Sequence, residues 1–347
     1  MCELPSLLVD SVSHRINGGE KMDKKTIRKI GILTSGGDAP GMNAAVRAAV
    51  RTAIGFDMEV IGIKRGYNGL IHGDFIALDA GAVGDMIQRG GTFLYTARCM
   101  EFMEEAGQKK AFEMAKKHGI EGIVVIGGDG SFRGAEKLSA MGLPTVGIPG
   151  TIDNDIVCTE YTIGYDTACN IGMEAIDRLR DTAQSHEKCS LIEVMGRKAG
   201  HLALEVGIAA GASAILVPEK EYDIKNEICR NITEGQKKGR THHIIIMAEG
   251  CRDKVQDVAE IIEKETGIST RVTVLGHIQR GGAPTVRDRV VATRMGYFAV
   301  ELLRAGRGNR LVAMKGNALT DYNINEGLMM KKSIDETLYT ICQTVAR

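Results

Sequence analysis

Two carboxylates separated by one residue form the most chemically suggestive pattern in the sequence. Asp153 and Asp155 lie in the run Pro-Gly-Thr-Ile-Asp-Asn-Asp at 149–155, which directly follows a short apolar stretch. Carboxylates at the end of a buried strand are costly unless they are solvated, bind a metal ion or exchange protons with a substrate. The pair therefore indicates metal binding, acid–base catalysis, or both.

Two glycine-rich loops are suited to holding an anion. Thr-Ser-Gly-Gly-Asp-Ala-Pro-Gly-Met-Asn at 34–43 and Gly-Gly-Asp-Gly-Ser at 127–131 each follow an apolar run. Backbone N–H groups in such loops approach phosphate closely, and a following helix N-terminus adds a favourable dipole. The alternative is a tight turn with Asp38 or Asp129 as a helix cap. Neither loop matches the dinucleotide fingerprint or the Walker loop.

Cationic side chains follow two further apolar runs. The segments Glu-Val-Met-Gly-Arg at 193–197 and Leu-Gly-His-Ile-Gln-Arg-Gly-Gly at 275–282 place Arg197, His277 and Arg280 at predicted strand ends. Alone, each arginine is more typical of a solvated surface charge. Combined with the loops and carboxylates, they complete a set in which glycines hold phosphates, carboxylates serve a metal and a base, and arginines bind a second anion.

The composition argues against several other functions. The chain has 347 residues with 44 basic and 44 acidic side chains, so no net charge attracts nucleic acid or an anionic membrane. Its eight cysteines are scattered without zinc spacing, which favours reduced thiols in a cytoplasmic protein. No apolar run approaches the ~18 residues of a membrane span. The 43 glycines indicate many tight turns or backbone close to ligands.

The elements that must position these residues alternate along the chain. Predicted strands cover 30–33, 59–63, 122–126, 145–148, 190–194, 214–217, 243–247, 271–275 and 310–314. Predicted helices include 41–54, 106–118, 170–184, 198–210, 255–266 and 287–305. Apolar strands alternating with helices predict parallel βαβ units covered on both faces. Ligands of such sheets bind beyond the carboxyl ends of the strands, where the motifs lie.

The first 26 residues differ from the rest. They lack the positive start and apolar core of a signal peptide and include Glu3 and Asp10, so we expect a disordered extension at 1–26. An alternative is that Met22 is the true start, with Gly-Gly-Glu-Lys at 18–21 being a ribosome-binding site translated in frame.

In order, spacing and flanking sequence, these motifs resemble those of bacterial ATP-dependent 6-phosphofructokinases from about Arg28 to the end of the chain. The resemblance implies two Rossmann-like, three-layer αβα lobes with mostly parallel sheets. It divides the chain into a larger ATP-binding lobe, 27–164 plus 277–328, and a smaller sugar-phosphate lobe, 165–276 plus 329–347. The implied reaction moves the γ-phosphoryl group of MgATP to the 1-hydroxyl of fructose 6-phosphate, giving fructose 1,6-bisphosphate and ADP in the committed step of glycolysis.

The resemblance also implies catalytic roles. Asp153 is similar to the general base that takes the proton from the sugar hydroxyl, and Asp129 to the magnesium-linked carboxylate. Thr151 and Asp155 resemble neighbours that place the substrate and tune the magnesium site. Charge on the transferring phosphoryl is implied to be stabilised by the Gly37 N–H, Arg98 and Arg197.

Contacts to both substrates follow from the same resemblance. Those implied for ATP are Gly37, Tyr67, Arg98, Cys99, Gly128, Asp129, Gly130 and Ser131. Those implied for fructose 6-phosphate are Thr151, Ile152, Asp153, Lys188, Met195, Gly196, Arg197, Glu249, Arg271, His277 and Arg280. Lys188 and Arg271 match residues that reach into a neighbour's site in the homotetramer usual for the family, so activity is expected to depend on assembly.

Two glycines indicate the phosphoryl donor. In the pyrophosphate-using branch of the family, Asp replaces the glycine at 130 and Lys replaces the glycine at 150. The Asp would crowd and repel an α-phosphate, and the Lys would compensate charge for a shorter donor. Gly130 and Gly150 therefore favour ATP.

Three positions depart from the family pattern. Lys188 stands where arginine is usual and lacks the bidentate fork for phosphate, so we expect a weaker hold on the 6-phosphate. Ala80 replaces an arginine and Ser213 a magnesium-linked glutamate of the family's allosteric site for ADP or phosphoenolpyruvate, so we expect altered or weak effector control. Residues that could still line that site are Arg47, Arg51, Arg180, Gly211, Lys238 and Arg240.

Other functions stay open at this stage. A pyrophosphate-dependent phosphofructokinase is the alternative within the family. An NAD or lipid kinase shares the Gly-Gly-Asp-Gly loop but lacks the other motifs. A catalytically weak regulatory subunit predicts the loss of Asp153, Asp129, Arg98 or Arg197, all of which are present.

Overall fold

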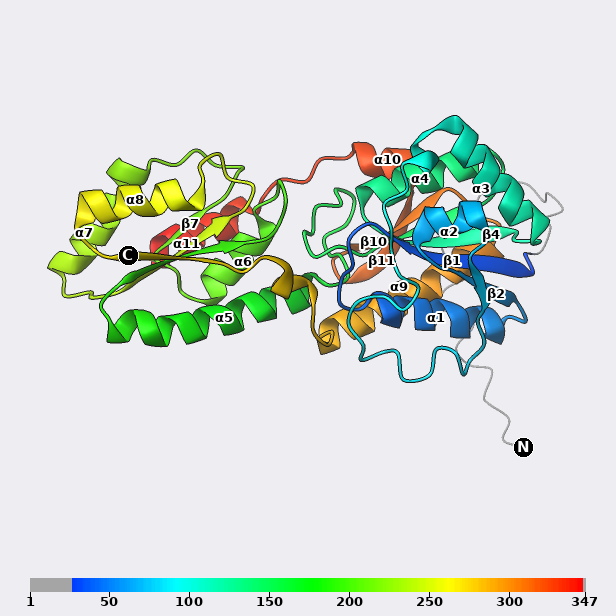
Figure 1. Cartoon of the computed structure of the whole chain (residues 1–347), viewed down its shortest axis with the longest axis horizontal. Helices are drawn as coiled ribbons and strands as arrows, with labels where there is room; N and C mark the ends of the chain where they lie inside the picture. The colour runs from blue at the N-terminus through cyan, green and yellow to red at the C-terminus, as the bar shows by residue number, and fades with distance from the viewer. Residues whose placement is uncertain (1–26, 346–347) are drawn as a thin grey trace.

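The computed structural model describes residues 27–345, so the expected extension at 1–26 and the alternative start at Met22 lie outside the described residues. The described chain forms two bodies that lie end to end, each built around one sheet (Figure 1). Both are α/β bodies with helices on the two faces of a mostly parallel sheet, which confirms the predicted fold class.

The larger sheet has seven strands. Their order is β11 (Ala318–Asn323), β10 (Arg310–Lys315), β5 (Thr145–Pro149), β4 (Gly122–Gly127), β1 (Lys29–Ser35), β2 (Glu59–Ile63) and β3 (Phe75–Ala77). The five inner strands run parallel, and the edge strands β3 and β11 pair antiparallel with β2 and β10. The inner strands are buried on both faces, as continuous apolar strands require.

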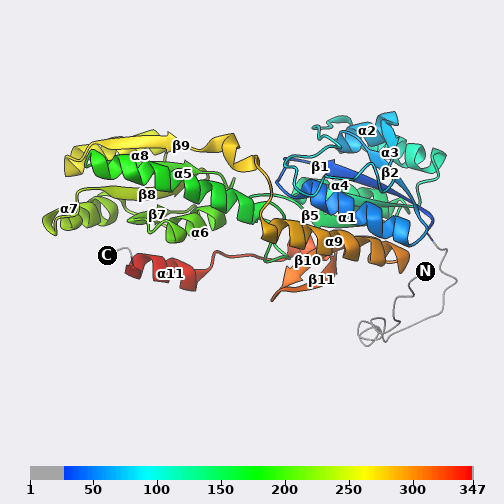
Figure 2. The same ribbon diagram turned by 90° about the horizontal axis from the view of Figure 1, so that it is seen from below.

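Helices cover both faces of the larger sheet (Figure 2). One face packs against α1 (Met42–Gly55) and α9 (Val286–Arg304), and the other against α2 (Gly66–His72), α3 (Glu105–Lys117), α4 (Asp129–Ala140) and α10 (Ile324–Met329). Strand β4 shows how one strand serves both layers, because Val124 and Ile126 face the first cluster and Ile123 and Val125 face the second.

The smaller sheet is parallel throughout. Its order is β7 (Ala214–Leu216), β8 (His243–Ala248), β6 (Cys189–Val194) and β9 (Thr270–Val274). Helices α5 (Tyr165–Ser185), α6 (His201–Ala209) and α11 (Glu336–Val345) lie on one side, and the π-helical turn η3 (Ile224–Cys229), α7 (Arg230–Lys237) and α8 (Val255–Thr266) on the other.

Three chain segments cross between the two bodies. They are 150–164 between β5 and α5, 275–285 between β9 and α9, and 330–335 between α10 and α11, with the short helix η4 (Gly276–Arg280) inside the second. The first two crossings carry candidate site residues, because the first holds Asp153 and Asp155 and the second holds Arg280. The junction between the bodies is therefore where the chemistry gathers.

All nine predicted strands are present within one or two residues, whereas β3 and β11 were not predicted. Both are antiparallel edge strands. β3 has only three residues, and β11 has the mixed sequence Ala-Leu-Thr-Asp-Tyr-Asn, so neither shows the apolar run by which the inner strands were found.

Candidate active site

The turn after β5 is closed by hydrogen bonds. Thr162 Oγ1 donates to the Thr151 carbonyl at 2.6 Å, and the Asp153 N–H donates to Thr151 Oγ1 at 3.2 Å. Asn154 adopts the left-handed conformation with φ of 50°, which asparagine tolerates better than most non-glycine residues. It lies between Asp153 and Asp155 in the chain.

Asp153 is a buried carboxylate that lacks a hydrogen-bond partner on Oδ1 among the described residues. Its side chain is 3% exposed, and its Oδ2 lies 3.8 Å from Arg197 Nε. Burial, then the charge of Asp155, raises the pKa of Asp153 to about 6, although Arg197 and Arg280 oppose this rise. A carboxylate with a free oxygen and a pKa near neutrality is equipped to accept a proton.

The loop after β6 presents Arg197 to both carboxylates. Its Nη1 lies 4.0 Å from Asp155 Oδ2, and Arg197 itself has φ of 55°. Glu249 fixes this loop by accepting the Gly196 and Arg197 N–H groups at 3.2 and 2.7 Å. These contacts bring Arg197 after β6 and Glu249 after β8 together with the two aspartates after β5.

Gln279 supports the same loop, a role that the sequence analysis missed. It is fully buried, and its Oε1 accepts the Met195 N–H at 2.9 Å. Gln279 lies inside the segment at 275–282 that was singled out for its charged residues. A buried polar side chain needs a hydrogen-bond partner. The bond from the Met195 N–H to Gln279 joins the second crossing to the loop that carries Arg197.

Arg280 lies against the first glycine-rich loop. Its Nη1 is 4.0 Å from Asp38 Oδ1, and a Cβ at Gly37 would overlap its guanidinium group. The absence of a side chain at Gly37 leaves room for the Arg280 guanidinium group in this position. The structure places the predicted sugar-phosphate arginine within reach of the predicted ATP loop.

Arg98 lies in a segment that is tied to this first loop. Thr34 Oγ1 donates to the Tyr95 carbonyl at 3.0 Å, and Thr96 Oγ1 donates to the Gly36 carbonyl at 2.7 Å. Arg98 is exposed and makes no ion pair among the described residues, and the neighbouring Cys99 is half-buried. The arginine is therefore available to a phosphate.

The second glycine-rich loop begins α4. Tyr67 stacks on Phe102 with ring centroids 4.0 Å apart and donates its hydroxyl to the Ser131 carbonyl at 2.5 Å. Burial raises the pKa of Tyr67 far above its usual value, so the hydroxyl stays a donor. Because Tyr67 is buried, it supports the loop from beneath.

Asp129 is the first residue of α4 and is partly exposed. Arg133, one turn later, donates to its carboxylate from Nε at 2.8 Å and from Nη2 at 3.2 Å, a pairing that the sequence analysis did not consider. The charge of Asp129 contributes to raising the pKa of Asp155, after burial as the main cause. The two carboxylates are thus close enough to interact.

The remaining predicted sugar contacts differ in accessibility. Ile152 is 2% exposed and Met195 is 7% exposed, so little of either side chain is open to solvent, whereas His277 is exposed in η4.

Lys188 and Arg271 are separated from the other candidates. Lys188 directly precedes β6, and Arg271 on β9 pairs with Ser190 at the start of β6, whereas Arg197 follows the other end of that strand. At ~3.3 Å per residue, the strand separates Lys188 from Met195 by roughly 20 Å. Neither residue can reach the carboxylates of its own chain.

The six candidate effector residues form two groups. Arg47 and Arg51 lie on α1 of the larger body, where Arg51 donates to the Ala80 carbonyl at 3.3 Å. The other group lies in the smaller body, where Arg180, Gly211 and Arg240 share a small hollow with Ser213. Within one chain, the two groups do not form one site.

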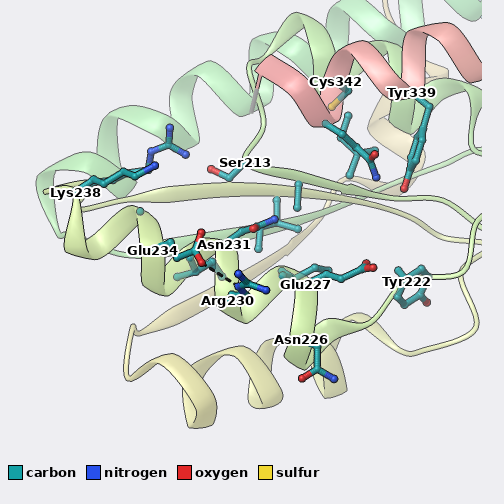
Figure 3. Close-up of a pocket in the computed structure, with 18 of the residues that line it drawn as sticks. Ser213, Tyr222, Asn226, Glu227, Arg230, Asn231, Glu234, Lys238, Tyr339 and Cys342 are labelled. Atoms are coloured by element: carbon teal, nitrogen blue, oxygen red, sulfur yellow. Dashed lines mark hydrogen bonds and ion pairs between the residues drawn. The ribbon is translucent and has the colours of Figure 1, made fainter. Parts of the chain in front are cut away.

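A larger cavity, of about 1050 Å³, opens beside this hollow. Figure 3 shows Ser213 and Lys238 at one end and Tyr339 and Cys342 of α11 across from Arg230. Arg230 is paired with Glu234 at 2.9 Å. This cavity contains none of the residues predicted for catalysis.

The described residues contain no helix long and apolar enough to cross a membrane, and no cluster of three or more His, Cys, Asp or Glu side chains that could cage a metal ion. Mg²⁺ commonly binds through one or two carboxylates and phosphate oxygens.

Comparisons with known proteins agree with this geometry. Residues 29–303 match the sequence pattern of the phosphofructokinase family. The chain is 52% identical to the ATP-dependent 6-phosphofructokinase of Clostridium botulinum strain Hall over 321 residues, and 54% identical to that of Bacillus cereus over 320 residues. Each match covers 92% of this chain and 100% of the relative.

Solved structures show the same fold. Phosphofructokinase from Saccharomyces cerevisiae superposes with a TM-score of 0.81 at 34% identity, covering 92% of this chain and 46% of the yeast chain. A pyrophosphate-dependent phosphofructokinase from Marinobacter aquaeolei superposes with a TM-score of 0.80 at 20% identity, covering 92% of each chain, which shows the fold alone. With its motifs, its fold and its relatives in agreement, the chain belongs to the phosphofructokinase family.

Proposed function

We propose that this protein is an ATP-dependent 6-phosphofructokinase that transfers the γ-phosphoryl group of MgATP to the 1-hydroxyl of fructose 6-phosphate. The observation that carries the proposal is the buried Asp153 carboxylate, which faces Arg197 at the junction of the two bodies and has one oxygen with no hydrogen-bond partner in the described part of the chain. The high identity to two ATP-dependent relatives over their full length supports it.

In the proposed reaction, Asp153 accepts the proton of the sugar hydroxyl as that oxygen attacks the γ-phosphorus. The pKa of about 6 keeps Asp153 mostly ionised at neutral pH yet basic enough to share the proton in the transition state. Arg197, Arg98 and the Gly37 N–H stabilise the charge on the transferring phosphoryl group, which is the main source of catalysis in such reactions.

Magnesium fits this site through Asp129, with Asp155 close enough to influence it. The ion neutralises phosphate charge when it is bound with ATP. For Asp129 to bind it, the ion pair with Arg133 has to open or rearrange. Arg133 is largely exposed and Asp129 is partly exposed, so this ion pair contributes little stability and can open readily.

The two bodies take different substrates in this proposal. The larger body, 27–164 plus 277–328, binds ATP, and the smaller one, 165–276 plus 329–347, binds the sugar phosphate through Glu249 and the loop at 195–197. Arg280 and His277 approach from the second crossing. The enzyme acts in the cytoplasm as a homotetramer, in which Lys188 and Arg271 serve a neighbouring site. We expect effector control to be altered or weak, because Ala80 and Ser213 replace an arginine and a glutamate of the family's effector site.

The two donor-indicating glycines have different surroundings. A Cβ at Gly130 meets nothing within 4 Å, so a side chain there would project into open space at the start of α4. A Cβ at Gly150 would lie 3.2 Å from both Ile126 and Met42, so packing restricts that position whatever the donor. Gly130 is therefore the cleaner test of donor identity.

We expect Gly130→Asp to fold normally and to raise the KM for ATP by tenfold or more, because its carboxylate would repel a phosphate. The matched control is Gly130→Ala, which adds a Cβ in the same open space without charge and should keep ATP use within about threefold. Initial rates with ATP and with pyrophosphate as donor measure both variants. Unchanged ATP kinetics in Gly130→Asp, or a wild-type preference for pyrophosphate, would overturn the assignment.

A further inference from the structure

Lys332 lies in the third crossing, 330–335, outside every motif considered above. This crossing links α10, which packs on α4 of the larger body, to α11, which packs against α6 and β7 of the smaller body (Figure 1). The Lys332 ammonium donates to the Asn154 carbonyl at 2.6 Å and to the Asn154 side-chain Oδ1 at 2.9 Å. The last crossing is thus fastened to the turn that carries both carboxylates.

The residue held by Lys332 is the one that shapes this turn. Asn154 is 6% exposed, has φ of 50°, and donates its own amide to the Glu160 carbonyl at 3.2 Å. Asparagine is one of the few non-glycine residues that adopt this conformation readily, so the backbone here is only mildly disfavoured. The two bonds from Lys332 and the bond to Glu160 hold the carbonyl and the side chain of Asn154 in place.

Burying the Lys332 ammonium costs free energy, so space filling alone does not explain why a lysine stands here. Burial lowers the pKa of Lys332 to about 8, and the charge of Asp155 opposes that decrease. The charged or titratable groups that influence or border it are Asp155, Cys158, Glu160, His201 and Lys315. The partly buried ammonium is stabilised here because two oxygens of Asn154 accept hydrogen bonds from it and the Asp155 carboxylate lies nearby.

We propose that Lys332 is a positioning residue for phosphoryl transfer, which holds Asn154 so that Asp153 and Asp155 keep their places opposite Arg197. This inference rests on the proposed function. Lys332 touches neither carboxylate by a hydrogen bond, so its effect reaches the reaction through the backbone of the turn. Because the same crossing continues into α11, the placement of the base also depends on how the smaller body is joined to the larger one.

The test compares substitutions at Lys332 in the full-length enzyme. Lys332→Met removes both donors, Lys332→Gln keeps an amide that can serve one acceptor, and Lys332→Arg keeps the charge and two donors. Lys331→Met is the matched control, since Lys331 is the exposed neighbour in the same crossing. Coupled assays give kcat and both KM values, and thermal unfolding gives Tm for each variant.

We expect kcat to fall about tenfold to a hundredfold in Lys332→Met, less in Lys332→Gln, and about threefold or less in Lys332→Arg, because a displaced base slows the chemical step. Both KM values should stay within about threefold, since the substrate-binding side chains are untouched. Lys331→Met should match the wild type in every quantity.

Two results would overturn the inference. If Lys332→Met lowers Tm but keeps the wild-type kcat, the residue stabilises the fold and does not position the base. If it raises the KM for fructose 6-phosphate at unchanged kcat, the residue binds substrate. Should Lys332→Met fail to fold, the order of kcat in the Gln and Arg variants decides instead. A wild-type enzyme without phosphofructokinase activity would refute the proposed function, which is a separate outcome.

Discussion

Asp153 and Asp288 are both buried aspartates, and they differ in what surrounds them. Asp288 is fully buried and accepts hydrogen bonds from the Tyr161 hydroxyl at 2.6 Å, the Gly164 N–H at 2.7 Å and both the N–H and the hydroxyl of Thr167. Asp153 has one oxygen without a hydrogen-bond partner among residues 27–345. A satisfied buried carboxylate is structural, whereas an unsatisfied one beside an arginine is available for chemistry.

The pKa of Asp153 predicts how activity depends on pH. A base must be ionised, so kcat/KM should fall about tenfold per pH unit below roughly pH 6 and level off above it. In Asp155→Asn, the midpoint of this fall should move to lower pH, because the negative charge of Asp155 helps to raise the pKa of Asp153.

Rates measured from pH 5 to 9 in both forms test this prediction. The phosphates of the substrates also titrate near pH 6, but they do so identically with either form, so the difference between the two profiles belongs to the enzyme. A midpoint that stays in place or rises in Asp155→Asn would contradict the assignment of Asp153 as the base.

Most of the candidate site residues that the fold brings together lie in short motifs at strand ends, which is why the sequence alone could single them out. Lys332 could not, because its partner Asn154 is 178 residues away along the chain and no local pattern marks it. Gln279 lay inside a recognised motif, but only the fold shows that its amide meets Met195, 84 residues earlier. Contacts of this kind depend on how the three crossings converge.

At the scale of elements, the starts of α5 and α9 are joined through Asp288. Asp288 lies in the first turn of α9, and its carboxylate oxygens accept hydrogen bonds from the backbone N–H groups of Gly164 and Thr167 at the start of α5. Thr285, the N-cap of α9, adds a bond from its hydroxyl to Asp166 at 2.6 Å. The first two crossings are therefore locked to each other where they enter their helices.

We expect Asp288→Asn to lower the free energy of unfolding by on the order of 2–4 kcal/mol, because an amide cannot accept from four donors as a carboxylate does. Denaturant unfolding measures the change. Asp257→Asn is the control, since Asp257 is exposed in the first turn of α8 and its replacement should stay within about 0.5 kcal/mol of the wild type. Equal stability of the two variants would show that the Asp288 network carries no net energy.

The inner strands could be predicted from the sequence because burial on both faces gives each of them a continuous apolar run. The long helices could be predicted because burial on one face repeats apolar residues at helical spacing. The edge strands β3 and β11 could not, because an edge is half exposed and its pairing is decided by the neighbouring strand. The order of the strands also lies beyond local pattern. β10 pairs with β5 through Arg310 and Leu311, far from it in sequence.

At the scale of the whole molecule, the positions of Lys188 and Arg271 predict that sites are shared between chains. In the proposed homotetramer, Asp153→Asn would remove the proposed base from its own site, and Arg271→Ala would remove a cation from a neighbour's site. In a mixed pair of such chains, one site keeps Asp153 from one chain and Arg271 from the other.

Reassembly of the two inactive variants in equal amounts should therefore restore about one quarter of the wild-type activity, because half of the pairs are mixed and each has one intact site. The rate of the mixture after dissociation and reassembly measures this. Mixing without dissociation is the control and should restore nothing. Activity no higher than that of the separate variants would show that each chain uses its own Arg271 or none.

The placement of β10 beside β5 also has a consequence for synthesis on the ribosome. About 160 residues separate the end of β5 at Pro149 from the start of β10 at Arg310, and the whole smaller sheet is made in between. At ~5–20 residues per second, roughly ten to thirty seconds pass before α9 and β10 emerge to cover α1 and β5. During that interval the apolar residues of α1 and β5 that α9 and β10 cover in the folded protein have no such cover, which exposes the first half of the larger body to aggregation during synthesis.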